Sequence, residues 1–204
     1  MTRIIAGTAG GRRLAVPSGQ GTRPTSDRAR EGLFGTVTAI CGTLHGARVL
    51  DLYAGSGAVG LEALSRGAAD VLLIEADRRA IGVIRDNVAA VGLPGARVLA
   101  GRVEFVLARG PGGEPPRDVV FADPPYVMPD AEVSAVLTAL LGAGWLSPGA
   151  VVAVERATRS GPPQWPAGYA ADRARKYGEA TLWYGRAAGA VPPGAPPRAP
   201  AEAP

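Results

Sequence analysis

The apolar positions along the chain follow two spacings, which together predict alternating strands and helices. Five short runs, most of them rich in Val, Leu and Ile, have the length of buried strands; they span residues 48–52, 70–75, 96–100, 119–122 and 150–154. Residues 58–66 and 78–91 have helical composition or spacing, and Gly92 follows the second segment as a stop signal. This alternation predicts an α/β fold with a Rossmann-like, doubly wound and mostly parallel sheet.

The N-terminal part of the chain departs from this pattern. Residues 3–16 surround a glycine pair and predict a short hairpin. Ser26 or Asp27 can then cap a helix, because apolar residues recur after them at three- and four-residue spacing; these are Leu33, Val37, Ile40 and Leu44. We expect this helix to pack on the main sheet.

The C-terminal part also departs from the βα pattern. Residues 173–177 and 180–184 are separated by Gly178-Glu179, which predicts an antiparallel hairpin at the sheet edge. The tail, residues 187–204, is almost wholly Ala, Pro and Gly, and we expect it to be disordered. The predicted organisation is therefore an N-terminal hairpin and helix (1–45), an α/β domain (46–186) and the tail.

Length and composition exclude several classes of protein. A chain of 204 residues can bury one sizeable core, and no apolar run approaches the roughly 20 residues of a membrane span. The first residues lack the apolar segment of a secretory signal, so we expect a cytoplasmic protein. Cys41 and His45 are the only residues of their types, which argues against a zinc or iron enzyme, and no metal site is expected.

Positive charge is concentrated at the start of the chain. Residues 1–31 hold six arginines against two acidic residues, and this excess of four equals the net charge of the whole chain. Codon bias explains why arginine is used in place of lysine, but it does not explain the clustering. A basic arm of this kind is typical of proteins that hold a phosphate backbone. The expected phosphate contacts are Arg12, Arg13, Arg23, Arg28 and Arg30.

A glycine-rich loop follows the first predicted strand. Gly55, Gly57 and Gly60 form a G-x-G-x-x-G arrangement before a helix, and Glu75 ends the next strand twenty residues after Gly55. Such a loop presents backbone N–H groups to an anionic group, and the later carboxylate can accept hydrogen bonds from ribose hydroxyls. The glycines alone are also compatible with tight turning and close helix packing. Together with the strand, the helix and Glu75, they predict a nucleoside cofactor.

Asp51 distinguishes between the cofactors that this spacing allows. A nicotinamide dinucleotide fits the glycines, but a carboxylate at the entry to the loop would repel its pyrophosphate. The same carboxylate suits the ammonium and sulfonium groups of S-adenosylmethionine. We therefore predict S-adenosylmethionine as the cofactor, bound by Asp51, Tyr53, Gly55, Ser56, Gly57, Glu75 and Ala76.

A second motif, Asp123-Pro124-Pro125-Tyr126, ends the fourth predicted strand. In a doubly wound sheet this strand lies beside the first, so the motif should face the cofactor. Two prolines lack N–H groups and stiffen the backbone, which leaves an acceptor-rich site suited to an aromatic amino group. Asp123 and a proline carbonyl can accept its two hydrogens, while Tyr126 stacks on the base. An ordinary proline-rich turn is the alternative.

These motifs resemble the amino-directed class I methyltransferases, whose signature is D/N-P-P-Y/F. Residues 23–34, 49–67 and 118–126 are similar to the RsmD family of 16S ribosomal RNA guanine-N2 methyltransferases. The resemblance implies that residues 46–186 form the methyltransferase domain and that residues 1–45 contact RNA. It further implies a monomer that methylates one guanine of 16S rRNA, within an assembling 30S particle.

One position departs from the family pattern. Many relatives carry an acidic residue after the third strand that contacts the adenine amino group, whereas this chain has Gly101-Arg102-Val103 there. The adenine contact is then expected from the backbone or from elsewhere, for example near Glu104.

Three alternatives remain open from the sequence. The acceptor could be an adenine in DNA or a glutamine amide in a protein, because both present an amino group to the same kind of site. The chain could also be a nucleotide-dependent oxidoreductase. Finally, it could be a non-catalytic module that binds RNA.

Overall fold

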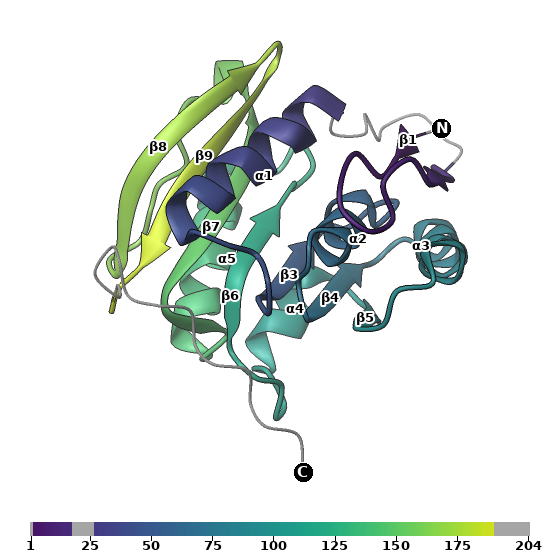
Figure 1. Cartoon of the computed structure of the whole chain (residues 1–204). Helices are drawn as coiled ribbons and strands as arrows, with labels where there is room; N and C mark the ends of the chain where they lie inside the picture. The colour runs from purple at the N-terminus through teal and green to yellow at the C-terminus, as the bar shows by residue number, and fades with distance from the viewer. Residues whose placement is uncertain (1, 18–26, 190–204) are drawn as a thin grey trace.

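The computed structural model describes residues 2–17 and 27–189, and its centre is a seven-stranded sheet in the order β5-β4-β3-β6-β7-β9-β8 (Figure 1). The strands are β3 (Arg48–Leu52), β4 (Asp70–Glu75), β5 (Ala96–Ala100), β6 (Arg117–Ala122), β7 (Leu146–Ala157), β8 (Tyr169–Tyr177) and β9 (Ala180–Ala187). The first five run parallel, whereas β9 pairs antiparallel with both β7 and β8. The predicted doubly wound sheet with an antiparallel C-terminal hairpin is confirmed.

Helices cover both faces of the sheet, with α1 (Asp27–Cys41), α2 (Ala58–Ser65) and α3 (Arg78–Val91) on one face and α4 (Val103–Ala108) and α5 (Asp130–Gly142) on the other (Figure 1). Successive residues of a strand point to opposite faces, so each central strand feeds two apolar cores. Val49 of β3 contributes to the core under α1–α3, whereas Leu50 contributes to the core under α4 and α5. This double burial explains why the strands are continuous apolar runs in the sequence.

The predicted N-terminal helix is present, but it is shorter than its apolar spacing indicated. It begins at Asp27 and ends at Cys41, because the chain turns at Gly42 with a positive φ of 82°. Leu44 therefore lies beyond the helix, although it is buried in the same core as Leu33. The guanidinium of Arg186 donates to the Ile40 carbonyl at 2.8 Å and so satisfies an acceptor of the last turn.

The N-terminal hairpin is short, with β1 (Thr2–Arg3) antiparallel to β2 (Arg13–Leu14). It is attached to α2 by the buried carboxylate of Glu62, which accepts the N–H groups of Ile5 at 2.6 Å and Ala6 at 3.0 Å. Leu14 is buried in the same core as the sheet. The hairpin thus shares a core with the α/β domain.

Two boundaries differ from the sequence interpretation. The fifth strand of the parallel set, expected over 150–154, extends over twelve residues, and the hairpin strand expected from residue 173 begins at Tyr169. The predicted tail begins at residue 187, yet Ala187 still pairs with Tyr169, and residues 190–204 lie outside the described part of the chain. None of the helices in the described residues is both long enough and apolar enough to cross a lipid bilayer.

Candidate cofactor and acceptor site

A single cavity of about 460 Å³ lies at the carboxyl ends of the central parallel strands. The glycine loop after β3 and the Asp-Pro-Pro-Tyr segment after β6 both line it, because these strands are hydrogen-bonded neighbours. The lining residues are Val16, Pro17, Arg30, Asp51, Tyr53, Ala54, Gly55, Ser56, Ala58, Val59, Glu75, Phe121, Asp123, Pro124, Pro125, Tyr126 and Val127. The two motifs that the sequence analysis singled out therefore share one cleft.

Asp51 is buried at the inner wall of this cavity. Its Oδ2 accepts the N–H of Gly60 at 2.9 Å, and burial raises the pKa of its carboxyl to about 8, with the Gly60 hydrogen bond opposing and the nearby Glu75 adding to the rise. Gly60 must be glycine for α2 to come this close, since a Cβ there would lie 2.7 Å from Cγ1 of Val71. A buried carboxyl of this kind is ionised more readily when a cation binds beside it.

Glu75 joins the loops that follow β3 and β4. Its Oε2 accepts the N–H of Gly55 at 2.8 Å, and its Oε1 accepts the N–H groups of Ala76 at 2.7 Å and Asp77 at 2.9 Å. A carboxylate offers about four acceptor positions, so one position on Oε2 remains after these three bonds. Glu75 can thus accept one ligand hydroxyl while it holds the loop. Ala76 takes part through its backbone and, among the described residues, does not line the cavity.

The glycine loop is shaped by its own backbone and by α3. Gly55 and Gly57 have φ values of 57° and 75°, and a Cβ on Gly57 would lie 3.1 Å from Cδ2 of Leu73. The side-chain amide of Asn87, buried on α3, donates from Nδ2 to the carbonyl of Ser56 at 2.9 Å. The same amide donates to the Ala15 carbonyl at 2.9 Å and accepts the Ala15 N–H at 2.8 Å. Asn87 therefore links the N-terminal segment to the loop.

Tyr53 lines the cavity and has a positive φ of 59°, a conformation that costs free energy for residues other than glycine. Its hydroxyl donates to Oε1 of Glu104 at 3.2 Å and lies 3.7 Å from the sulfur of Met128. Burial raises the pKa of this phenol above its ordinary value, and the carboxylate of Glu104 raises it further. Glu104 thus positions Tyr53, and it is not among the described residues that line the cavity. An adenine contact from Glu104 gains no support from this arrangement.

The Asp-Pro-Pro-Tyr segment, which begins at Asp123, lines the part of the cavity that we call the acceptor half. The backbone N–H of Asp123 donates to the Leu52 carbonyl at 3.4 Å, which places this residue one position beyond the last pair of β6 and β3. Burial raises the pKa of its carboxyl well above the ordinary value, and the neighbouring carboxyls of Glu155 and Asp51 raise it further. At the mouth of the cavity, Tyr126 is 41% exposed and Val127 is 90% exposed.

The loop that follows this motif is held by Arg156 of β7. Its buried guanidinium donates from Nη2 to the Met128 carbonyl at 2.9 Å and to Oδ1 of Asp130 at 2.8 Å. These contacts connect the first turn of α5 to the last strand of the parallel set. The Asp-Pro-Pro-Tyr segment is thereby supported from both ends, by β3 before it and by β7 after it.

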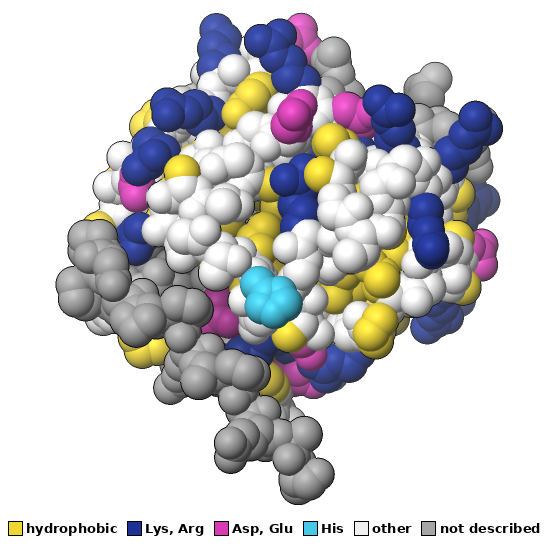
Figure 2. Space-filling view, in the orientation of Figure 1, with side chains coloured by type: hydrophobic (Ala, Val, Ile, Leu, Met, Phe, Trp, Pro, Cys, Tyr) yellow, Lys and Arg dark blue, Asp and Glu magenta, His cyan; other side chains and the backbone are white. Residues whose placement is uncertain are grey.

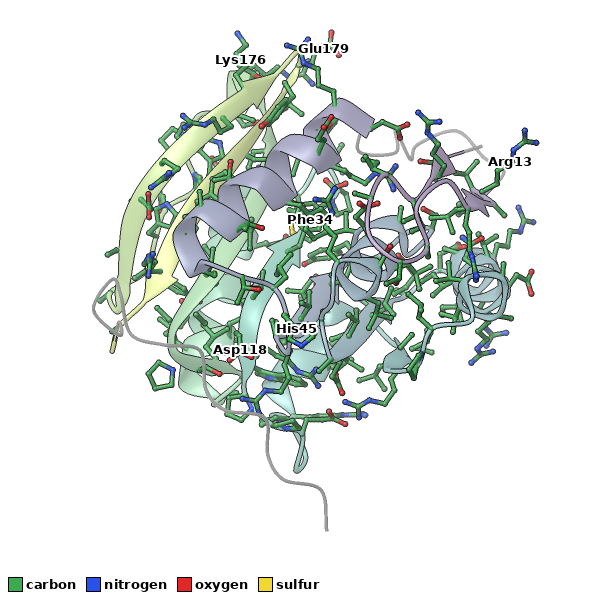
Figure 3. All side chains as sticks on the ribbon, in the orientation of Figure 1. Arg13, Phe34, His45, Asp118, Lys176 and Glu179 are labelled. Carbon is green, nitrogen blue, oxygen red and sulfur yellow. The ribbon has the colours of Figure 1, made fainter. Side chains whose placement is uncertain are left out.

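The predicted phosphate contacts fall into different environments. Arg13 and Arg28 are exposed, and Figure 3 shows Arg13 extending away from the hairpin. Arg12 is exposed as well, but its Nη1 donates to the carbonyls of Ala90 and Val91 at the end of α3. On the face drawn in Figure 2, Lys and Arg side chains gather over the N-terminal hairpin and over the β8–β9 end.

Arg30 differs from the exposed arginines. The side chain of Arg30 has no exposed surface, which argues against the phosphate contact expected of it. Its position is set by α1 and the hairpin, which enclose it together. Arg23 lies outside the described residues.

Three residues that support the site were not predicted from the sequence, Glu62, Asn87 and Arg156, although two of them carry a recognisable signal. Glu62 is the one charged residue within the apolar segment 58–65, and Asn87 lies on the buried face of α3, in register with Ile84 and Val91. A polar side chain at such a position is buried only when it has hydrogen-bond partners. This rule identifies both residues as anchors but does not name their partners.

A parallel sheet in this order, with an acidic residue before a glycine loop and Asp-Pro-Pro-Tyr on the adjacent strand, defines a class I S-adenosylmethionine-dependent methyltransferase fold. The chain belongs to the family described as conserved hypothetical protein 95, whose model matches residues 2–186. It is 38% identical over 178 residues to ribosomal RNA small subunit methyltransferase D of Escherichia coli (strain K12), which covers 87% of this chain and 85% of that protein.

Two further relatives agree with this assignment. The protein of the same name from Haemophilus influenzae is 36% identical over 154 residues, covering 75% of this chain and 77% of its own. Among solved structures, the Escherichia coli protein yhhF, provisionally described as a methyltransferase, superposes with a TM-score of 0.80 at 34% identity, covering 92% of this chain and 98% of its own. The resemblance to the RsmD family is confirmed, and the cofactor is S-adenosylmethionine.

The described residues fit this cofactor in three respects. The buried carboxyl of Asp51, with its raised pKa, favours a cationic group. Glu75 keeps one acceptor position for a ribose hydroxyl. Gly55, which has a positive φ of 57° and lines the cavity, lets the loop backbone approach the ligand without a side chain between them, whereas Gly57 packs against the core and does not line the cavity among the described residues.

Proposed function

We propose that the protein methylates the exocyclic N2 amino group of a guanine in 16S rRNA of the small ribosomal subunit. The observation that supports this proposal best is the shared cavity, in which Asp51 and Glu75 face the same space as Asp123 and Tyr126. The names of the relatives support ribosomal RNA as the substrate class. The family assignment sets aside the oxidoreductase and non-catalytic hypotheses.

In the proposed mechanism, Asp123 and the carbonyl of Pro124 hold the amino group that receives the methyl group. A guanine amino group offers two N–H bonds, and its lone pair is delocalised into the ring. Acceptance of one hydrogen by Asp123 and the other by the Pro124 carbonyl orients the nitrogen and localises its lone pair. Bound S-adenosylmethionine supplies an electrophilic methyl group to this position.

The environment of Asp123 also suits the loss of a proton from the methylated nitrogen. Burial and the carboxyls of Glu155 and Asp51 raise the pKa of Asp123, so its ionised form is a stronger proton acceptor than an ordinary aspartate. A cation held at Asp51 favours that ionised form. Asp123 therefore has two roles in the proposal, to hold the amino group and to receive its proton.

The exposed side chains Tyr126 and Val127 lie where an RNA base would enter the cavity. An RNA base must leave its stack to reach a cavity behind Pro124 and Pro125, and Tyr126 offers an aromatic face to it at the rim. Arg12, Arg13, Arg23 and Arg28 then contact the phosphate backbone, as their charge predicts. We further propose that the protein acts as a monomer in the cytoplasm, on an assembling 30S particle.

Nucleoside analysis tests this proposal. In a strain from which the gene is deleted, mass spectrometry of small-subunit rRNA should show the loss of one N2-methylguanosine, which the wild-type gene restores and the Asp123→Asn gene does not. An unchanged N2-methylguanosine content would contradict the proposal. Loss of N6-methyladenine from DNA in its place would support the DNA alternative.

A further inference from the structure

Positive charge is also concentrated in the C-terminal strands of the sheet. Residues 158–187 hold five basic residues against two acidic ones, whereas residues 32–157 hold ten basic against thirteen acidic. An evenly charged, solvated surface would not separate the two signs in this way. The excess of positive charge therefore lies in two segments, the basic arm at the start of the chain and the β8–β9 end.

Three of the five basic residues in 158–187 are exposed and form no ion pair within the described part of the chain. The other two share Asp172, whose Oδ1 lies 2.6 Å from Nε of Arg173 and whose Oδ2 lies 3.7 Å from Nε of Arg186. The second acidic residue of the segment is Glu179, in the turn between β8 and β9, so the three exposed cations still outnumber it. These three, which we call the β8–β9 basic surface, are Arg159, Arg175 and Lys176.

The turn between β8 and β9 lies at the edge of the sheet where the cavity opens. Parallel strands bring their carboxyl ends to one edge, and β7 ends there beside β6. Ala180, the first residue of β9, pairs with the last residue of β7, and the Thr158 N–H donates to the Glu179 carbonyl of the turn at 2.7 Å. Lys176, near the end of β8, and Arg159, just after β7, therefore lie at the same edge as the Asp-Pro-Pro-Tyr segment.

The two basic segments lie on opposite sides of the cavity. The N-terminal segment is attached to α2 through Glu62 and to α3 through Asn87, and these helices pack on the β3–β5 half of the sheet. The β8–β9 basic surface belongs to the other half, with the cavity between β3 and β6. Neighbouring strands are about 4.8 Å apart, so β8, three strands from β6, lies about 14 Å from the Asp-Pro-Pro-Tyr segment. Figure 3 shows Lys176 and Arg13 at these two ends of the molecule.

Helix α1 connects the two segments across the face of the sheet. A Cβ on Gly32 would clash with the hydroxyl of Tyr177, so the first half of α1 passes directly over the end of β8. Arg28 is exposed and lies four residues before Gly32, on the same face of the helix. It therefore extends the positive surface from the hairpin toward the β8–β9 basic surface.

Resting on the proposed function, we propose that the β8–β9 basic surface is a second phosphate-binding surface for the RNA that carries the target base. A stacked strand carries one negative charge about every 3.4 Å, so about four nucleotides span the roughly 14 Å from the Asp-Pro-Pro-Tyr segment to β8. Cations on both sides of the cavity hold the backbone on either side of a base that has left its stack. Such contacts set the register of the RNA without reading its sequence.

Removal of the three charges tests the phosphate contacts. The combined variant Arg159→Gln, Arg175→Gln and Lys176→Gln should lower the slope of log affinity for 16S rRNA against log salt by about 0.7–0.9 for each charge. Its affinity for S-adenosylhomocysteine should equal that of the wild type, because these residues lie outside the cavity lining. Each single variant should lower the slope by one such step, which gives a readout if the combined variant does not fold.

Arg109→Gln is the matched control for these variants. Arg109 is exposed, follows α4 and precedes the start of β6, so it lies toward the opposite edge of the sheet. Its removal should leave the slope unchanged. A combined variant that keeps the wild-type slope would overturn the inference.

Site-directed crosslinking tests where the RNA lies. Cys41 is the single cysteine, so a Cys41→Ser background can receive Lys176→Cys, Arg13→Cys or Arg109→Cys, each then labelled with an azidophenacyl group. We would crosslink these proteins to 16S rRNA, as naked RNA and as assembled particles that lack the methyl group. Lys176→Cys and Arg13→Cys should crosslink to opposite sides of the target guanine, and Arg109→Cys should give only background. Background crosslinking from Lys176→Cys would contradict the inference.

Methyl transfer by the same preparations distinguishes the inference from the proposed function. If the wild type methylates a guanine of 16S rRNA while the combined variant keeps its salt dependence and Lys176→Cys gives background crosslinking, the inference fails and the proposed function stands. If the wild type methylates no guanine in either form of the RNA, the proposed function fails, whatever the slopes show.

Discussion

The two halves of the cavity differ in how firmly they are held. On the cofactor side, Glu75 holds three backbone N–H groups and Asn87 joins the glycine loop to the N-terminal segment. On the acceptor side, the Asp-Pro-Pro-Tyr segment reaches the surface, where Tyr126 is 41% exposed and Val127 is 90% exposed. The cofactor half is therefore held by internal hydrogen bonds, whereas the rim of the acceptor half is open to solvent.

This difference explains how one fold can bind a common cofactor and a rare substrate. The cofactor meets donors and acceptors that are held in place by the sheet, so little order has to be created on binding. The acceptor half meets its ligand through exposed side chains such as Tyr126. We expect selectivity for the base to depend on this half.

Asp51 lies on the cofactor side, and the raised pKa of its carboxyl predicts a large effect of pH on cofactor binding. Burial raises the pKa of this carboxyl to about 8, so it is mostly protonated at pH 6 and 7 and must ionise to favour a cationic ligand. Affinity for S-adenosylhomocysteine should therefore rise with pH, by about tenfold for each unit below 8, and level off above it. Calorimetry between pH 6 and 8 measures this, and binding should release a proton.

The Asp51→Asn variant is the matched control for this titration. It keeps the shape of the side chain and removes the charge, so its affinity should be low and nearly independent of pH. A wild-type affinity that does not change between pH 6 and 8 would mean that Asp51 does not pair with the ammonium group, which is the cationic group of S-adenosylhomocysteine.

Gly60 tests whether the organisation of the cofactor half depends on close packing. Ala at this position would place Cβ 2.7 Å from Cγ1 of Val71 and 3.2 Å from Oδ2 of Asp51. Overpacking of this kind should cost about 1–3 kcal/mol in the free energy of unfolding and weaken cofactor binding. Gly82→Ala, where the Cβ meets nothing within 4 Å, should leave both unchanged or improve stability. Equal behaviour of the two variants in urea denaturation would refute the packing argument.

The smallest effect is expected outside the cavity, from the exposed arginines. Neutralising Arg13 or Arg28 to Gln should lower the slope of log affinity for RNA against log salt by about 0.7–0.9 for each charge. The exposed Arg85, on a helix face of α3, provides a control that should leave the slope unchanged. If all three variants give the wild-type slope, the basic arm does not contact phosphate.

Much of the cofactor half could be predicted from sequence because its determinants are local. Gly55, Gly57 and Gly60 follow directly after a strand, and Asp51 and Asp123 end up adjacent because parallel strands bring their carboxyl ends to one edge. Two strands begin where the local sequence does not favour a strand. β7 begins before Pro148 and Gly149, and β8 begins in the segment 169–172, which contains two alanines and no β-branched residue. Both are edge or irregular regions where pairing, not local preference, decides.

The contacts that support the site were harder to predict because they join distant segments. The sequence marks Arg30 as one of several arginines in a basic arm, whereas the structure buries its side chain and pairs it with Thr2 and Arg3 of the hairpin and with Asp27. Similarly, the partner of Glu104 is Tyr53, about fifty residues earlier in the chain. Periodicity shows which face of a helix is buried, but it does not show what lies opposite.

We propose that cofactor binding and amino-group activation occupy separate halves of one cavity. The purified Asp123→Asn variant tests this separation when calorimetry with S-adenosylhomocysteine and single-turnover methyl transfer are measured on the same preparation. We expect an affinity within about twofold of the wild type and a transfer rate about 10²–10³ times lower. A variant that transfers methyl groups at the wild-type rate, or one that loses affinity and rate together, would contradict the claim.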